Sequence, residues 1–197
     1  MEKTKPSEPI NLAIFASGNG SNAINIINYF EKKEDVTVKK IFCNKTEAPV
    51  IGKAKAKGIS SYIFNKSQLE EDNFILTQLK ALGIDYIILA GFLLKIPKHI
   101  VQHFEDKIIN IHPALLPKYG GKGMYGKYVH QAVVDNKEPK TGISIHFVNE
   151  NYDEGSIIFQ AECEVLKTDT ANDVADKIHD LEMTYFPRII EQTIKVY

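Results

Sequence analysis

The sequence lacks several features that would assign a protein to a class at once. It has only two cysteines among its 197 residues and a net charge of −1. Cys43 and Cys163 lie far apart without a CxxC or a metal-ligand spacing, so we expect core thiols rather than a disulfide. Lysines and acids are spread along the chain, and no basic cluster indicates a nucleic-acid partner. A disulfide scaffold and a nucleic-acid-binding surface are therefore not expected.

A long hydrophobic run is also missing. No apolar stretch approaches the roughly 18 residues of a membrane span, and the polar residues 1–9 lack the apolar centre of a signal peptide. We therefore expect a cytoplasmic protein with no membrane partner. The apolar share of 44% and the charged share of 25% are typical of a globular protein. The length fits one domain over residues 10–197, preceded by a flexible segment over residues 1–9.

Strand-like and helix-like patterns alternate along the chain. Short apolar runs predict strands, at residues 11–15, 36–43, 62–64, 86–90, 108–111, 142–148 and 156–164. Helical spacing of apolar residues predicts helices, at residues 21–33, 49–57, 67–82, 97–104, 128–135 and 171–196. This alternation predicts a doubly wound α/β fold. Its sheet would be mostly parallel and twisted, with helices on both faces and an antiparallel strand near the C-terminal end.

A glycine loop with the sequence SGNGSN joins the first predicted strand to the first predicted helix, at residues 17–22. The amides of Gly20, Ser21 and Asn22 would point outward at the helix N-terminus, where the helix dipole favours an anion such as a phosphate. The same residues also fit a turn that caps the helix and binds no ligand.

The loop also satisfies the dinucleotide fingerprint GxGxxA through Gly18, Gly20 and Ala23. That fingerprint calls for an acid about 20 residues further on, which binds a ribose hydroxyl. Asn44 and Lys45 occupy that place. A single phosphate is therefore the preferred ligand, and a dinucleotide is the alternative.

Asn110 and His112 stand at the end of a predicted strand, within the run IINIHPALLP at residues 108–117. Alternation along a strand puts both side chains on one face and Ile111 on the other. An amide donor beside a titratable ring suits a reaction with a developing oxyanion and a mobile proton. The competing interpretation is a core histidine whose ring is bonded to backbone.

A catalytic imidazole needs a partner that holds its tautomer and stabilises its charged form. Asp153 is the best candidate, in a turn between the last two predicted strands, and Glu154 is its rival. A turn aspartate that only bonds its own backbone is also common. His146 alternates with apolar neighbours, so we expect a mainly structural role for it.

A metal site is not expected. His99 and His103 form an i, i+4 histidine pair, but no acid is placed to complete a ligand set and no HExxH motif is present.

Four motifs in combination point to a family. Residues 17–22 read SGNGSN, residues 89–97 LAGFLLKIP, residues 110–121 NIHPALLPKYGG and residues 142–155 GISIHFVNENYDEG. From about residue 10 to the C-terminus the chain resembles the phosphoribosylglycinamide formyltransferases, folate-dependent enzymes of purine synthesis. The resemblance implies a Rossmann-like formyltransferase fold. It also implies transfer of a formyl group from the co-substrate 10-formyltetrahydrofolate to the amine of glycinamide ribonucleotide, without a metal, by a monomer or a homodimer.

The resemblance also implies roles for particular residues. Asn110, His112 and Asp153 look like the catalytic trio. The residues similar to the family's ribonucleotide site are Asn19, Gly20, Ser21, Asn22 and Glu182. The folate would lie along one segment, held largely by its backbone groups, and near one turn. The segment consists of Phe92, Leu93, Leu94, Lys95 and Ile96, and the turn includes Asn149, Glu150, Asn151 and Tyr152.

These roles fit the chemistry of formyl transfer. Attack of a neutral amine on the formyl carbon creates an oxyanion, for which the Asn110 amide and a His112 imidazolium would supply donors. Asp153 would favour the charged form of His112 and relay the amine's proton through water to the departing folate nitrogen. We therefore expect the pKa of His112 to lie above that of a free histidine.

After Tyr119 the chain departs from many relatives, whose short loop contains a histidine. Residues 120–130 read GGKGMYGKYVH, which is longer and rich in glycine. Lys122, Tyr125 and His130 are the candidates for that histidine's place, and the sequence does not choose among them.

The sequence leaves three alternative functions open. Another folate-dependent formyltransferase, or a formyltetrahydrofolate hydrolase, would be expected to carry a further C-terminal or N-terminal domain. A dinucleotide-binding protein would need Asn44 for its ribose. A non-catalytic ligand-binding relative would have little reason to keep Asn110, His112 and Asp153 together.

Overall fold

The computed structural model describes residues 8–71 and 73–196. A seven-stranded sheet runs through these residues in the order β3-β2-β1-β4-β5-β6-β7. Its strands are β1 (Ile10–Ala16), β2 (Val36–Cys43), β3 (Ser61–Ile63), β4 (Tyr86–Leu89), β5 (Ile108–His112), β6 (Lys140–Phe147) and β7 (Ile157–Glu164). Strands β1 to β5 pair in parallel, whereas β6 is antiparallel to both β5 and β7. The predicted fold class is therefore confirmed.

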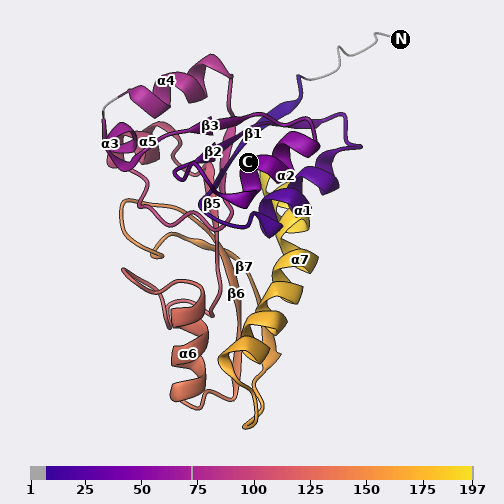
Figure 1. Ribbon diagram of the computed structural model, residues 1–197, viewed down its shortest axis with the longest axis vertical. Helices are drawn as coiled ribbons and strands as arrows, with labels where there is room; N and C mark the ends of the chain where they lie inside the picture. Colours follow the sequence, from indigo (N-terminus) through magenta and orange to yellow (C-terminus); the bar gives the residue numbers. More distant parts are fainter. Residues whose placement is uncertain (1–7, 72, 197) are drawn as a thin grey trace.

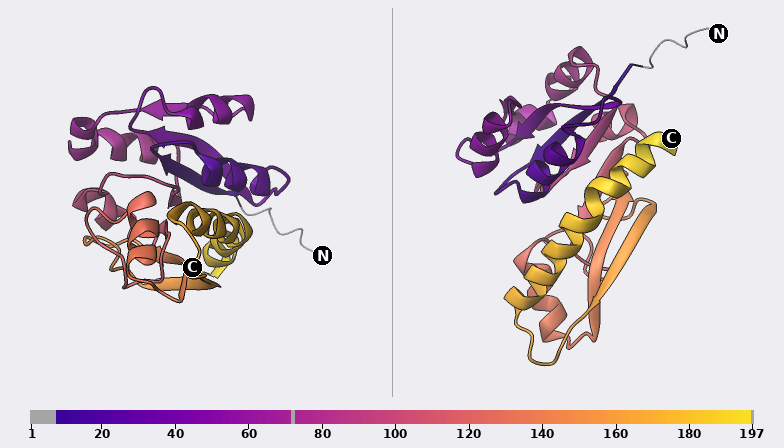
Figure 2. Two further views of the ribbon diagram at one scale, coloured as in Figure 1. Left: turned by 60° about the horizontal axis from the view of Figure 1, so that its bottom comes forward. Right: turned by 90° about the vertical axis from the view of Figure 1, so that its right-hand side faces the viewer.

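Helices cover both faces of the sheet (Figures 1 and 2). They are α1 (Ser21–Phe30), α2 (Pro49–Ala56), α3 (Lys66–Glu70), α4 (Phe74–Ala81), α5 (Lys98–His103), α6 (Lys127–Asp135) and α7 (Ala171–Val196). Side chains alternate along β1, so Ile14 belongs to the apolar cluster that includes residues of α1 and α7, whereas Phe15 belongs to the cluster on the other face that includes Ile75 of α4. Two apolar layers thus hold the sheet between them.

One predicted helix, over residues 67–82, is wrong, because the structure has α3 and α4 there. Asn65 caps α3 by accepting the backbone N–H of Gln68 at 2.9 Å, and the Gln68 side chain accepts the Asn65 N–H at 2.9 Å. Glu71 is already extended, and Asn73 precedes α4 at a φ of 74°. Asparagine tolerates this left-handed conformation better than most residues, which explains the break. The other predicted bounds agree within three residues.

Glu191 of α7 ties that helix to α1 and to the segment after it. Its carboxylate accepts hydrogen bonds from Tyr29 at 2.6 Å, Lys33 at 2.6 Å and Lys195 at 2.8 Å. The hydrogen bonds from Lys195, Lys33 and Tyr29 lower the pKa of Glu191 to about 2.

Replacing Glu191 with glutamine should therefore destabilise the protein at neutral pH. We expect the free energy of unfolding to fall by about 1–2 kcal/mol at pH 7, since charge-assisted bonds at a partly exposed site are screened by solvent. A carboxylate whose pKa is lowered by folding stabilises above its unfolded pKa and loses this effect as the pH falls. The difference from wild type should thus shrink between pH 4.5 and about 2 in urea titrations. The control is Glu162→Gln, because the Glu162 carboxylate lies 2.7 Å from Nζ of Lys140 with both side chains exposed. Equal loss of stability in this control, or a difference that does not change with pH, would contradict the prediction.

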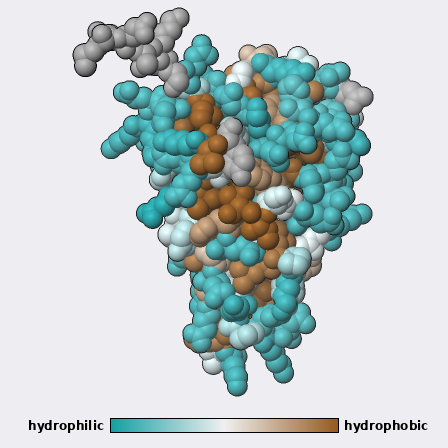
Figure 3. Space-filling model, turned by 180° about the vertical axis from the view of Figure 1, so that it is seen from behind, coloured by the Kyte–Doolittle hydropathy of each residue, from teal (hydrophilic) through white to brown (hydrophobic). Residues whose placement is uncertain are grey.

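No helix in the described ranges is long and apolar enough to span a membrane. Figure 3 shows a band of apolar surface between hydrophilic flanks on the face opposite to that of Figure 1. The expectation of a monomer or a homodimer stays a prediction, as does the single domain over residues 10–197. Residues 1–7 of the expected flexible segment lie outside the described residues.

Candidate functional site

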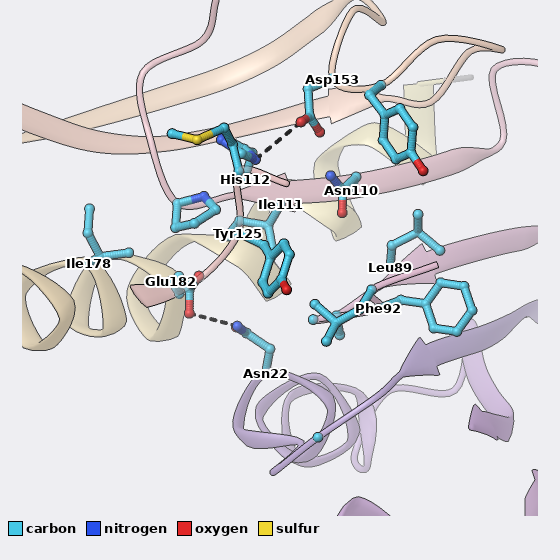
Figure 4. A pocket seen from close by; sticks show the side chains of 18 of the residues that line it. Asn22, Leu89, Phe92, Asn110, Ile111, His112, Tyr125, Asp153, Ile178 and Glu182 are labelled. Atoms are coloured by element: carbon cyan, nitrogen blue, oxygen red, sulfur yellow. Dashed lines mark hydrogen bonds and ion pairs between the residues drawn. The ribbon is translucent and has the colours of Figure 1, made fainter. Parts of the chain in front are cut away.

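A cleft of about 790 Å³ opens beside the carboxyl ends of β1, β4 and β5. Strand order reverses between β1 and β4, which lie next to each other while β2 and β5 flank them. Open α/β sheets form their ligand sites at such a switch point, because the loops that follow the two strands diverge there. Figure 4 shows the interior of the cleft.

The glycine loop forms one end of the cleft, where residues 18–22 line it. Gly20 has a φ of 76°, and a Cβ built on it would lie 2.3 Å from Cγ2 of Val50. Only glycine therefore fits at this position of the loop. Lys53 of α2 holds the preceding residue by donating to the Asn19 carbonyl at 3.1 Å and to its side-chain oxygen at 2.5 Å. The first turn of α1 thus faces the cleft from a fixed position, as an anion site requires.

Helix α7 brings a carboxylate to this end of the cleft. Pro187 lies inside α7 and has no N–H, so the helix supplies no donor to the Met183 carbonyl one turn earlier. Asn25 of α1 donates its side-chain N–H to that carbonyl at 2.9 Å. Nearby, Asn22 donates to Oε2 of Glu182 at 2.8 Å (Figure 4). Burial raises the pKa of Glu182, while the hydrogen bond from Asn22 lowers it.

The structure brings Asn110, His112 and Asp153 together in the middle of the cleft (Figure 4). The His112 ring is 4% exposed, and its Nε2 lies 2.7 Å from the Tyr119 carbonyl. A carbonyl only accepts, so Nε2 carries the proton and donates. The other ring nitrogen, Nδ1, lies 3.6 Å from Oδ2 of Asp153. In the neutral ring, Nδ1 is therefore the position that can take a proton.

The geometry distinguishes the two candidate acids. Asp153 has a φ of 55° and faces His112, and its Oδ2 accepts the backbone N–H of Gly121 at 2.9 Å. The Glu154 carboxylate instead accepts the side-chain N–H of Asn151 at 2.8 Å, within the turn. Asp153 is thus the acid placed beside the histidine.

The expectation that the pKa of His112 lies above that of a free histidine is wrong for the ligand-free protein. Burial lowers the pKa of His112, and the charge of Asp153 and the hydrogen bond to Tyr119 only partly oppose this. An ionised ring loses its hydration inside the protein, and a carboxylate that is 3.6 Å away does not fully replace it. The neutral form of His112 is therefore favoured at neutral pH before substrates bind.

Two segments predicted to hold the folate line the other end of the cleft, namely residues 92–96 and the turn that follows β6. Ser17 positions the first segment, since its hydroxyl accepts the Leu93 N–H at 3.0 Å and donates to Asn44 at 2.6 Å. The segments approach each other where Nζ of Lys95 lies 5.2 Å from the Tyr152 ring centroid.

Every residue predicted for the site lines the cleft except Glu150. The Glu150 carboxylate lies outside it, 3.1 Å from Nζ of Lys98 and 3.2 Å from Nε2 of Gln102. Glu150 lies in the turn that follows β6, and its neighbours Asn149, Asn151 and Tyr152 line the cleft whereas Glu150 does not.

The glycine-rich loop after Tyr119 lies over the cleft. Lys122 and Tyr125 are exposed, and in the view of Figure 4 the Tyr125 ring lies between the side chains of His112 and Asn22. His130 at the start of α6 is only 7% exposed, and its Nδ1 has no hydrogen-bond partner in the described part of the chain. Burial lowers the pKa of His130, as does the nearby His112.

Sequence reasoning missed several residues of the cleft, above all His146. Its ring lines the cleft, and its Nε2 lies 3.0 Å from Nδ2 of Asn110. Helix α7 contributes Ala175, Ile178 and His179 in addition to Glu182. The antiparallel register that pairs Asn110 with His146 depends on which residues of β5 and β6 meet, and periodicity alone does not define this. No group of three residues able to hold a metal ion occurs within residues 8–71 and 73–196.

Comparison with known proteins places the chain in a family. The model of the formyl transferase family matches residues 10–190. The chain belongs to the formyl transferase family. Its formyl transferase relatives include the chloroplastic phosphoribosylglycinamide formyltransferase of Arabidopsis thaliana, to which it is 37% identical over 93% of this chain and 66% of the relative. The chain thus spans just under two thirds of that relative's length.

Two bacterial proteins are also similar to this chain. The phosphoribosylglycinamide formyltransferase of Bacillus subtilis is 34% identical, over 92% of this chain and 93% of its own length. The solved structure of the Anaplasma phagocytophilum phosphoribosylglycinamide formyltransferase superposes with a TM-score of 0.84 at 30% identity. It covers 92% of this chain and 84% of that one. The resemblance seen in the four motifs is confirmed at the level of the family.

The contacts of Asn44 do not support the alternative that the glycine loop binds a dinucleotide. Its side-chain oxygen accepts the Ser17 hydroxyl at 2.6 Å, and it does not line the cleft of the formyl transferase site. The position where a dinucleotide fold places its ribose-binding acid therefore holds an amide that supports the loop instead.

Proposed function

We propose that the chain transfers the formyl group of 10-formyltetrahydrofolate to the amine of glycinamide ribonucleotide, a step of purine synthesis. One observation carries this proposal. A single cleft holds the N-terminus of α1 at one end, apolar side chains at the other, and Asn110, His112 and Asp153 between them. The names of the relatives, phosphoribosylglycinamide formyltransferases, support the same formyl acceptor.

The ends of the cleft differ in chemistry, and we assign the substrates accordingly. The amides at Gly20 and Ser21 suit the phosphate of the ribonucleotide, and Glu182 suits its ribose hydroxyls. The other end has apolar walls from Leu89, Phe92 and Val148, which suit the flat ring system of a folate. The amine and the formyl group would then meet beside Asn110 and His112.

The side chains between the two ends can manage the charge and the proton of the reaction. A bond forms between the amine nitrogen and the formyl carbon, and the bond from that carbon to the folate nitrogen breaks. The Asn110 amide donates to the oxyanion that develops on the formyl oxygen. Neutral His112 takes the amine's proton on Nδ1 and gives it to the departing folate nitrogen. Asp153 and the Tyr119 carbonyl stabilise the imidazolium while it exists.

In the proposed mechanism the His112 imidazolium forms during the reaction, whereas the sequence led us to expect it before substrates bind. A ring that is neutral at rest accepts the proton without first losing one, and the partly buried Asp153 offsets the cost of the charge at the moment it appears.

Release of tetrahydrofolate, followed by absorbance, tests the proposed function. We expect turnover when the protein is mixed with 10-formyltetrahydrofolate and glycinamide ribonucleotide, and none when the ribonucleotide is left out. Equal release without the ribonucleotide would indicate a hydrolase instead. No release of tetrahydrofolate with both substrates present would contradict the proposed function.

Replacing Glu182 with glutamine should weaken binding of the ribonucleotide without destabilising the fold. Loss of a charged acceptor costs about 1.5–3 kcal/mol, so we expect KM for the ribonucleotide to rise by about 10- to 100-fold while KM for the folate stays unchanged. Folding raises the pKa of Glu182, so its ionised form opposes folding once the pH exceeds its unfolded pKa. Urea unfolding at pH 7 should thus show equal or greater stability. Unchanged KM for the ribonucleotide would contradict the role.

The cytoplasmic location stays a proposal from composition, since the Arabidopsis relative is named chloroplastic and the Bacillus relative is not. The folate as specific formyl donor is likewise proposed here, from the family and from the apolar end of the cleft.

A further inference from the structure

His146 lies beside Asn110, and both nitrogens of its ring are engaged. The antiparallel register of β5 and β6 places Asn110 opposite His146, whose ring is 1% exposed. Nε2 of His146 lies 3.0 Å from Nδ2 of Asn110. Nδ1 lies 2.7 Å from the carbonyl oxygen of Phe147.

These two contacts determine the tautomer of His146 and the orientation of Asn110. A carbonyl oxygen only accepts, so Nδ1 of His146 carries the proton that it donates to Phe147. The neutral ring then has a lone pair at Nε2. Only an N–H group satisfies that lone pair, so the amide nitrogen of Asn110, rather than its oxygen, must face His146.

We propose that His146 is a positioning residue that fixes which end of the Asn110 carboxamide serves the formyl oxygen. The inference rests on the proposed function, because it concerns Asn110 as the donor to the oxyanion. One N–H of Asn110 is held by His146, which leaves the second N–H for the cleft. In Figure 4 the amide nitrogen lies on the side of His112 and Asp153, and the oxygen points the other way. The donor N–H and the His112 ring thereby serve the same side of the reacting carbon.

The neutral state of His146 also keeps Asp153 available to His112. Asp153 lies between the two rings, with Oδ2 at 3.6 Å from Nδ1 of His112 and Oδ1 at 3.7 Å from Nε2 of His146. A proton on Nε2 of His146 would attract Asp153 away from His112 and would repel the Asn110 N–H. The contact of Asp153 with His112 and the contact of His146 with Asn110 would then both be lost. Burial lowers the pKa of His146, and the hydrogen bond to Phe147 and the charge of Asp153 only partly oppose this, so the neutral ring is favoured.

The tautomer can be measured without any substrate. In 15N-correlated NMR spectra of the histidine rings in the ligand-free protein, we expect the His146 signal to be that of an Nδ1–H ring at neutral pH. An Nε2–H ring, or a ring protonated at neutral pH, would overturn the proposal. This measurement stands even if the turnover assay fails, so it separates the inference from the proposed function.

Kinetics test whether the contact matters for the reaction. His146→Leu removes the acceptor, and we expect kcat to fall by about 10- to 100-fold with KM for both substrates nearly unchanged, since misplaced catalytic groups cost rates of that order. His146→Gln keeps an acceptor oxygen and should recover most of the loss. The matched control is His103→Leu on α5, which lies outside the cleft and should keep wild-type kcat.

A folded His146→Leu protein with wild-type kcat would overturn the role. So would a His146→Gln protein no faster than His146→Leu, because a structural role alone would not distinguish an acceptor from a hydrocarbon in kcat. Circular dichroism and thermal unfolding establish that the variants fold. If the leucine variant does not fold, the kcat of the glutamine variant and the NMR measurement still test the proposal.

Discussion

Replacing His112 with glutamine should lower kcat by about 10³-fold, because general acid–base catalysis supplies about 10²–10⁴ and glutamine cannot carry a proton. Glutamine can still donate a hydrogen bond to the Tyr119 carbonyl, so we expect the fold and both KM values to change little. Steady-state kinetics with saturating folate measures the effect. The control is His103→Gln, which alters a histidine outside the cleft and should keep wild-type kcat.

The pH profile adds a second readout for the same group. His112 acts in its neutral form, so kcat/KM should fall as the pH drops below the pKa of His112, which burial holds under its ordinary value. The charge of Asp153 raises that pKa, so Asp153→Asn should move the acid limb to lower pH while reducing kcat by about 10²-fold or more. A His112→Gln protein with an intact kcat and acid limb would show that another group moves the proton.

Replacing Gly20 with alanine should damage both the fold and phosphate binding. The added Cβ would lie 2.3 Å from Cγ2 of Val50, at a φ of 76° that an alanine adopts with strain. Overpacking costs about 1–3 kcal/mol, and the left-handed backbone about 1–2 kcal/mol. We expect the free energy of unfolding to fall by about 2–4 kcal/mol and KM for the ribonucleotide to rise at least about tenfold.

Gly18→Ala is the matched control for this substitution. Gly18 lies in the same loop and also lines the cleft, yet a Cβ built on it meets nothing within 4 Å. Urea unfolding and ribonucleotide KM should therefore stay close to wild type in Gly18→Ala. Equal behaviour of the two alanine variants would mean that the contact with Val50 does not shape the loop.

Much of the architecture was predictable because it follows from local patterns. Apolar runs and their alternation indicated the strands, and the parallel order placed the ends of β1, β4 and β5 at one edge of the sheet. Asn110 and His112 share a face simply because strand side chains alternate. The motif resemblance then favoured Asp153 over Glu154 and supplied Glu182, and both Asp153 and Glu182 lie far from that strand in the sequence yet reach the same cleft.

The remaining features depend on tertiary contacts that no local pattern carries. The pKa of His112 follows from how deeply the fold buries it, which outweighs a charged neighbour that the sequence did suggest. His146 looked structural because its neighbours are apolar, and its contact with Asn110 exists only through the register of two antiparallel strands. The break between α3 and α4 depends on Asn73 in a left-handed conformation, against an apolar spacing that favours one helix.

The fate of a labelled formyl carbon tests the proposed reaction most directly. The protein would be incubated with 10-formyltetrahydrofolate carrying 13C in its formyl group and with glycinamide ribonucleotide, and the products followed by 13C NMR. We predict that the label appears as a formamide on the ribonucleotide, at a rate that Asn110, His112 and Asp153 control. Label recovered as free formate, or left on the folate, would contradict transfer at this site.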